Sequence, residues 1–112
     1  PAKVFGKESG DLLVIGWGGT HGAIRSAVET AQDKGMTVSH LHLRHLNPFP
    51  KNLGEILVKF QKVMIAELNM GQLSTIIRSK FLVDAVSLNK VQGKPFTQTE
   101  VYNKITKLVK GI

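Results

Sequence analysis

The 112-residue chain is long enough for one domain, and its 42% hydrophobic content is that of a folded protein rather than a disordered one. It has no cysteine, which excludes disulfides, cysteine nucleophiles and thiolate-held zinc or iron–sulfur centres within this segment and is compatible with the cytoplasm. The net charge of +7 favours acidic partners, but the lysines are dispersed and no apolar run reaches the roughly 20 residues of a membrane span, so we expect neither a nucleic-acid nor a membrane partner.

The first half of the chain predicts strands on either side of one helix. Residues 3–5 and 12–15 are expected to pair as an antiparallel hairpin, because a short polar turn that contains glycine joins them. The second of these runs is uninterrupted and apolar, which predicts a central strand covered on both faces. Thr20 is expected to cap the following helix and Gly35 to end it, and residues 37–43 form the next strand. The buried face of this helix is expected to hold Ile24, Ala27, Val28 and Ala31.

The second half repeats the strand–helix alternation. Asn52 is expected to cap a helix, residues 63–66 form another apolar strand, and the next helix opens at Gly71. A last short strand spans residues 85–88, and residues 97–100 match a capping box at the start of the closing helix. This alternation predicts a single three-layer α/β domain in which a mostly parallel sheet carries helices on both faces.

Four glycines lie within seven residues, at positions 16, 18, 19 and 22, where an apolar strand meets a predicted helix. The cluster does not match a dinucleotide fingerprint, because His21 occupies the place of the third glycine, and it lacks the lysine of a phosphate-binding P-loop. The backbone N–H groups of Gly18, Gly19 and Thr20 could still hold an anion, which leaves a stand-alone anion- or nucleotide-binding α/β module as the alternative function. The simpler interpretation is that the glycines turn the chain tightly and let the helix pack close to the sheet.

The four histidines do not suggest a metal site. His40 and His42 share a strand face at the i, i+2 spacing that two metal ligands can use. His45 points the other way if the strand continues, and His21 lies on another segment, so no third ligand is evident. The pattern favours interface or semi-buried imidazoles, and we predict no metal in this segment.

Glu67 ends an apolar strand at the carboxyl edge of the predicted sheet, where α/β proteins place their sites, and Asn69 and Gln72 follow at the start of the next helix. General acid–base catalysis would need a partner of different pKa, and Asp84 is the one other acid whose placement is not obviously exposed. A helix cap or an interface salt bridge is the simpler role for Glu67. Because the sequence also lacks a Ser-His-Asp arrangement and a nucleophile elbow, we predict no catalytic residue in this domain.

Several collinear segments together span nearly the whole chain: GDLLVIGWGGT (10–20) with GAIR (22–25), LRHLNPFP (43–50), ELNMGQL (67–73), and VDAV (83–86) with NKVQG (89–93). They resemble the C-terminal domain of the alpha subunit of 2-oxoglutarate:ferredoxin oxidoreductases. The resemblance implies a transketolase C-terminal-like fold, a three-layer α/β/α domain with a mostly parallel, five-stranded mixed sheet whose first strand is antiparallel. It also implies that residues 1–112 are one domain of a longer alpha subunit.

By this resemblance, the parent enzyme oxidatively decarboxylates a 2-oxoacid such as 2-oxoglutarate to acyl-CoA and passes the electrons to ferredoxin. Its cofactors would be thiamine diphosphate, magnesium, an iron–sulfur cluster and coenzyme A, none of them held by this segment, which matches no thiamine–magnesium motif. The domain alone is expected to be inactive and to serve architecture and subunit contacts in the cytoplasm. Its partners would be the other domains of the alpha subunit, the beta subunit and, at the level of the complex, ferredoxin.

The expected contact surface is the carboxyl edge formed by residues 18–21, 47–49 and 67–72. Within it, the candidate interdomain or anion contacts are Gly18, Gly19, Thr20, His21, Asn47, Glu67, Asn69 and Gln72. Direct docking of acidic ferredoxin on the basic surface is a further alternative, which the dispersal of the lysines disfavours.

Overall fold

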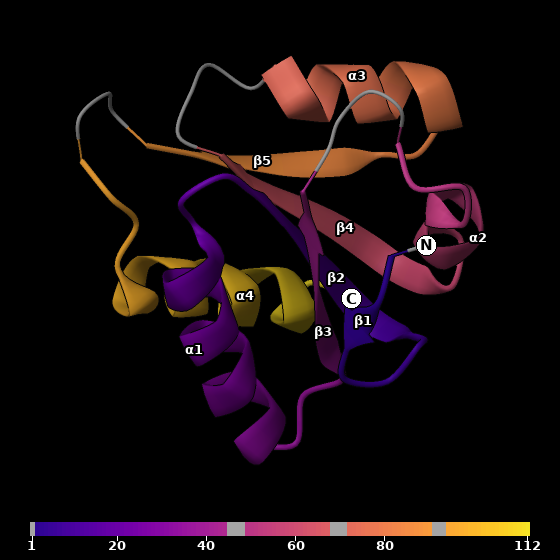
Figure 1. Ribbon diagram of the computed structural model, residues 1–112. Coiled ribbons are helices and arrows are strands. Elements are labelled where there is room, and N and C mark those ends of the chain that lie inside the picture. The colour runs from indigo at the N-terminus through magenta and orange to yellow at the C-terminus, as the bar shows by residue number, and fades with distance from the viewer. Residues whose placement is uncertain (1, 45–48, 68–71, 91–93) are drawn as a thin grey trace.

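The computed structural model describes residues 2–44, 49–67, 72–90 and 94–112, which form one sheet with helices on both faces (Figure 1). The elements are β1 (Val4–Phe5), β2 (Gly10–Trp17), α1 (His21–Asp33), β3 (Val38–Leu43), α2 (Leu53–Leu57), β4 (Phe60–Glu67), α3 (Gln72–Phe81), β5 (Ala85–Asn89) and α4 (Gln98–Lys110). The five strands lie in the order β1-β3-β2-β4-β5. β1 is antiparallel to β3, and all other neighbours are parallel. The predicted fold class, a mostly parallel five-stranded sheet with an antiparallel first strand, is confirmed.

The predicted hairpin between the first two strands is wrong. β1 pairs with β3, where Val4 lies opposite Leu41 and Phe5 opposite His40. β2 has no free edge for β1, because β3 and β4 form long parallel ladders along its two sides. The turn after β1 is instead held to β3, since the Ser39 hydroxyl donates a hydrogen bond of 2.6 Å to the Lys7 carbonyl oxygen. Burial of three apolar strands side by side outweighs pairing between neighbours in sequence.

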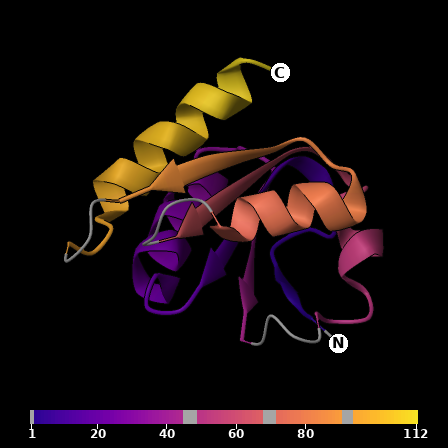
Figure 2. The same ribbon diagram turned by 90° about the horizontal axis from the view of Figure 1, so that it is seen from above.

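Two hydrophobic layers sandwich the sheet, with α1 and α4 over one face and α2 and α3 over the other (Figures 1 and 2). Alternate residues of β2 enter opposite layers, so Leu12 and Val14 contact the α1 and α4 side while Leu13 and Ile15 contact the α2 and α3 side. All four of these side chains are fully buried. The predicted central strand is therefore confirmed. The buried face of α1 also consists of the predicted residues, Ile24, Ala27, Val28 and Ala31.

The predicted helix boundaries at Thr20, Gly35, Asn52 and Thr97 are confirmed, but Thr20 and Asn52 do not cap their helices with their side chains. Gly71, the predicted start of the third helix, lies outside the described residues. The capping box at Thr97 and Glu100 is present, and Gly35 follows α1 with a φ of +87°. Thr20 precedes α1 without a capping hydrogen bond from its side chain. Asn52 likewise does not cap α2, because its amide group exchanges hydrogen bonds of 2.9 and 3.0 Å with the backbone of Ala2. The Asn52 side chain is therefore taken by a partner that is distant in sequence, whereas the Thr20 hydroxyl bonds to the Trp17 carbonyl three residues earlier.

None of the helices in the described part of the chain combines the length and the apolar character that crossing a membrane requires.

Candidate functional site

The carboxyl edge of the sheet is the place where the fold can form a site. β2 and β4 are neighbours in the middle of the sheet, and the chain leaves β2 for α1 on one face and β4 for α3 on the other. In open α/β sheets, ligands bind beyond the carboxyl ends of the strands where successive connections diverge in this way. Six of the eight predicted contact residues lie at this edge; the other two, Asn47 and Asn69, are outside the described residues, as is His45.

The glycine cluster is explained by backbone geometry at two positions. Gly18 has a φ of +73°, a conformation that favours glycine, at the corner between β2 and α1. At Gly16, an added Cβ would lie 2.5 Å from Ile24 Cδ1 and 2.8 Å from His42 Nδ1, so α1 can approach β2 only because this side chain is missing. Gly19 has open space around it. The structure therefore supports the interpretation in which the glycines turn the chain and permit close packing.

The N-terminus of α1 lacks a side-chain cap. The Thr20 hydroxyl turns back and donates to the Trp17 carbonyl oxygen at 3.3 Å, although the residue is only 2% exposed. The first helical hydrogen bond runs from Ile24 N–H to the Thr20 carbonyl. The N–H groups of the first turn carry the partial positive charge of the helix N-terminus, and no side chain of the described residues neutralises it there.

Glu67 lies at the end of β4 and caps α3. The side chain is fully buried, and its two carboxylate oxygens accept backbone hydrogen bonds from Leu73 at 3.0 Å and Ser74 at 3.1 Å. A negative charge at a helix N-terminus is favourable, because it satisfies N–H groups that have no partner within the helix. The arrangement is the helix-capping alternative for Glu67, and it leaves the carboxylate facing the helix rather than solvent. Gln72, the first residue of α3, is exposed.

Three imidazoles lie together where α1 begins, although sequence reasoning grouped only His40 and His42 and left His21 on another segment. The ring centroids of His21 and His40 are 5.2 Å apart, those of His21 and His42 4.9 Å, and those of His40 and His42 5.6 Å. Arg25 adds a fourth basic group, because its Nε–H donates to His40 Nδ1 at 3.4 Å. Right-handed crossover of α1 above β3 is the signal that could have placed His21 next to the strand histidines.

Both strand histidines are held neutral. Burial is the main cause that lowers the pKa of His40 to about 3, with smaller effects of Arg25, His42 and His21. Burial also lowers the pKa of His42, an effect that its hydrogen bond with the Gly18 carbonyl, 3.0 Å from Nε2, partly opposes. Within the part of the chain that the structure describes, His40 Nε2 and His42 Nδ1 are buried and have no hydrogen-bond partner.

This cluster does not have the chemistry of a metal centre. Because Arg25 donates to His40 Nδ1, the proton of the neutral ring sits on Nε2, and a protonated nitrogen cannot ligate a cation. The charged guanidinium next to it also repels cations. Within the described segments, no group of three His, Asp or Glu side chains has the geometry to hold a metal.

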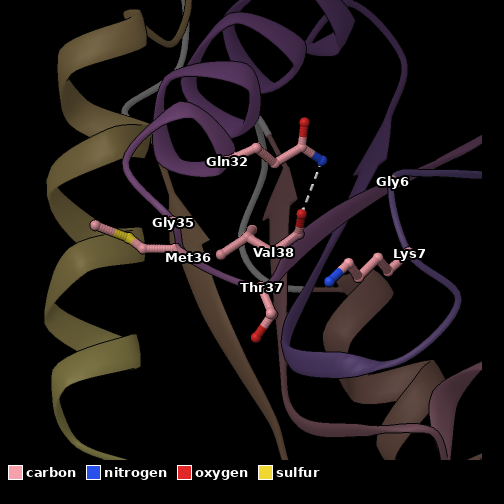
Figure 3. Close-up of a pocket in the computed structure, with 7 residues that line it drawn as sticks. All are labelled: Gly6, Lys7, Gln32, Gly35, Met36, Thr37 and Val38. Atoms are coloured by element: carbon pink, nitrogen blue, oxygen red, sulfur yellow. Dashed lines mark hydrogen bonds between the residues drawn. The ribbon is translucent and has the colours of Figure 1, made fainter.

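A cavity of about 430 Å³ lies at the opposite end of β3 (Figure 3). Its lining residues are Gly6, Lys7, Gln32, Gly35, Met36, Thr37 and Val38. The Gln32 amide already donates to the Val38 carbonyl oxygen at 2.9 Å, so it fastens α1 to β3 rather than facing a ligand. The lining residues do not bring together a set of polar side chains that could bind or activate a substrate, so the carboxyl edge remains the candidate site.

Comparisons with known proteins agree with the observed fold. The family described as pyruvate:ferredoxin oxidoreductase core domain II matches residues 10–101. The 2-oxoglutarate oxidoreductase subunit KorA of Mycobacterium tuberculosis is 50% identical over 91 residues, which cover 81% of this chain and 14% of that protein. The solved 2-oxoglutarate:ferredoxin oxidoreductase of Magnetococcus marinus, with 2-oxoglutarate, coenzyme A and succinyl-CoA bound, superposes with a TM-score of 0.90 at 27% identity.

The match to the Magnetococcus marinus enzyme covers 97% of this chain and 20% of that chain. A split-gene transketolase has the same fold, with a TM-score of 0.73 at 15% identity over 96% of this chain and 41% of that one. The chain therefore spans about one-seventh of KorA and about one-fifth of the Magnetococcus marinus chain. Its structural likeness extends to transketolase.

Proposed function

The chain belongs to the pyruvate:ferredoxin oxidoreductase core domain II family, and from this premise we propose that it is a structural, contact-making domain of the alpha subunit of a 2-oxoglutarate:ferredoxin oxidoreductase. Such an enzyme oxidatively decarboxylates a 2-oxoacid to acyl-CoA and passes the electrons to ferredoxin. The observation that carries the proposal is the near-complete superposition of this chain on about one-fifth of a 2-oxoglutarate:ferredoxin oxidoreductase chain. The likeness to KorA at 50% identity supports 2-oxoglutarate as the 2-oxoacid.

Two of the cofactors that such an enzyme needs, the iron–sulfur cluster and magnesium, can be compared with the residues of this domain. An iron–sulfur cluster is held by thiolates, and the sequence has no cysteine. Magnesium prefers carboxylate oxygens, but both oxygens of Glu67, the buried carboxylate of the described residues, accept hydrogen bonds from α3. We therefore propose that magnesium and the iron–sulfur cluster lie in other parts of the enzyme. From the family resemblance we expect the same of thiamine diphosphate and coenzyme A, and we expect the domain alone to be inactive.

In this proposal, the carboxyl edge is the surface that meets the neighbouring domains of the alpha subunit and the beta subunit. Gly18, Gly19, His21 and Gln72 are exposed there, while Glu67 supports the edge from inside by holding α3. Ferredoxin interacts at the level of the whole complex, and the proposed location is the cytoplasm.

Replacing His21 by Asp in the complete enzyme tests this role. A new negative charge on an interdomain surface is expected to reduce recovery of the beta subunit with the alpha subunit, or the turnover with 2-oxoglutarate, at least tenfold. Asn103→Asp is the matched control, because Asn103 is an exposed neutral residue on α4 that also gains one negative charge. Unchanged assembly and turnover in His21→Asp would refute the proposed contact surface.

A further inference from the structure

The side chains of His21, Arg25, His40 and His42 form a nitrogen-rich group that we call the His–Arg cluster. We propose that this cluster binds an anion, a carboxylate or phosphate group, and that it takes up a proton as the anion binds. The inference does not depend on the proposed function, because all four side chains belong to this chain. It rests on an unused buried donor, on unpaired positive charge and on open space at the first turn of α1, where His21 lies.

The unused donor is His40 Nε2–H. The residue is 1% exposed, and the hydrogen bond from Arg25 Nε to Nδ1 fixes the proton on Nε2, which has no acceptor. Buried N–H groups are almost always paired in native proteins, because burial removes the water that would otherwise accept their hydrogen bond. An anion oxygen placed beside the ring would supply the missing acceptor.

The charge around the cluster is uniformly basic. The Arg25 guanidinium packs on an aromatic ring, with its central carbon 3.8 Å from the centroid of Phe5. It forms no ion pair, because the one ion pair among the described residues joins Lys90 to Glu100. The groups that act electrostatically on His40 are Arg25, His42 and His21, and those that act on His42 are His21, Arg44 and Arg25. The positions that pair with these histidines in β1 and β2 are Phe5, Val14 and Gly16, which carry no charge. No carboxylate offsets these bases within the described part of the chain, so an anion meets attraction without competition.

Space for a ligand exists at the end of α1. An added Cβ at Gly18, Gly19 or Gly22 would meet no atom within 4 Å, so the first turn of the helix is open. Its N–H groups have no side-chain cap and add favourable dipoles for negative charge.

The coupling to a proton follows from the tautomer of His42. A carbonyl oxygen can only accept, so the ring donates from Nε2 to Gly18, and Nδ1 is left as a bare, partnerless acceptor. An anion next to that lone pair is repelled unless Nδ1 is protonated. Anion binding therefore becomes tighter as the pH falls, because His42 Nδ1 is protonated more readily and the protonated ring no longer repels the anion.

The probe for the test is sulfate, which keeps its charge between pH 5.5 and 8 and stands in for phosphate, with acetate as the carboxylate probe. Histidine ring NMR resonances of the 112-residue chain are followed during titration at constant ionic strength. We expect saturable shifts of His40 and His42, with an affinity at least tenfold higher at pH 5.5 than at pH 8. Ring resonances that do not respond at either pH would overturn the proposal and leave an internal water as the partner of these nitrogens.

Two variants isolate the cluster. Arg25→Gln is expected to weaken sulfate binding at least tenfold, whereas the matched control Arg78→Gln changes an exposed arginine of α3 on the other face of the sheet and is expected to bind as the unaltered chain does. His42→Asn is expected to remove the pH dependence, and it serves on its own if Arg25→Gln does not fold. Equal affinities in Arg25→Gln and Arg78→Gln, or unaltered pH dependence in His42→Asn, would contradict the proposal.

The same titration separates the two sources of the anion. If an acidic side chain of a neighbouring domain is the natural occupant, sulfate binds the 112-residue chain and not the assembled enzyme. If a free anion is the occupant, sulfate binds both with similar affinity. If sulfate does not bind the 112-residue chain, the proposed anion site is wrong whichever source of the anion is considered.

Discussion

The two helices that follow the central strands begin at the same edge of the sheet, but their first turns are completed differently. The chain supplies its own anion to α3, since the buried Glu67 carboxylate accepts hydrogen bonds from Leu73 and Ser74. At α1 it supplies none, and the neighbouring side chains are the bases of the His–Arg cluster. A helix N-terminus therefore becomes a candidate anion site only where no side chain of the protein neutralises its partial positive charge.

The first prediction tests this difference between α3 and α1 by removing the Glu67 carboxylate. We expect Glu67→Ala to lower the free energy of unfolding by about 3 kcal/mol, because two buried N–H groups lose a charged acceptor. Glu67→Gln keeps one acceptor oxygen and is expected to cost about 1 kcal/mol. Urea unfolding monitored by circular dichroism measures both changes.

Glu55→Ala is the matched control, because Glu55 is an exposed acid in the first turn of α2. Its effect should stay within about 0.5 kcal/mol. Equal decreases in the free energy of unfolding in Glu67→Ala and Glu55→Ala would show that the buried cap of α3 stabilises the fold no more than an exposed acid does.

The second prediction concerns the close approach that places α1 over the sheet. Gly16→Ala is expected to destabilise the chain by about 2 kcal/mol, because the added Cβ meets Ile24 Cδ1 at 2.5 Å and His42 Nδ1 at 2.8 Å. Gly19→Ala, made where there is open space, should change the unfolding free energy by less than about 0.5 kcal/mol. Thermal unfolding of the two variants ranks them, and a Gly19→Ala loss as large as that of Gly16→Ala would disprove the packing explanation.

The third prediction concerns the pH dependence of the unfolding free energy, to which the buried His40 near α1 contributes. The pKa of His40 is lowered from 6.5 to about 3 in the folded chain. Above pH 6.5 the ring is neutral in both states, whereas below it the unfolded chain binds a proton that the folded chain does not, so stability falls as the pH falls. The slope from this group is at most about 1.4 kcal/mol per pH unit.

Urea unfolding between pH 7.5 and 5.5 measures this slope above the range in which most carboxylates titrate. His40→Gln, which has no ring to protonate, is expected to show a shallower slope than the unaltered chain. The same slope in both proteins would mean that His40 is not the group responsible.

Much of the fold could be predicted from local pattern, and the errors at β1 and Asn52 share one cause. The apolar run Leu12–Ile15 and the capping box at Thr97 are satisfied by nearby residues or by simple burial, so periodicity and spacing identify them. The pairing of β1 and the hydrogen bonds of Asn52 depend on segments that are distant in sequence. Local pattern cannot rank such partners, because each is available only after the sheet has formed.

The candidate site shows the same division. The sequence placed Glu67 at the end of a strand and proposed a helix cap as its simpler role, but it left His21 apart from His40 and His42. Ring contacts of 4.9 to 5.6 Å arise only because α1 crosses back over β3. Which basic side chains lack an acidic partner is likewise a property of the assembled molecule.

By itself, the sequence determined that this chain forms an α/β domain with apolar inner strands and, through its motifs, the family to which it belongs. Tertiary structure alone decided which strand β1 joins, which helix N-terminus receives a carboxylate, and which imidazole nitrogens are buried without partners. The physical reason is that hydrophobic periodicity is a short-range property, whereas hydrogen-bond partners and electrostatic environment are set by segments that meet only in the folded state.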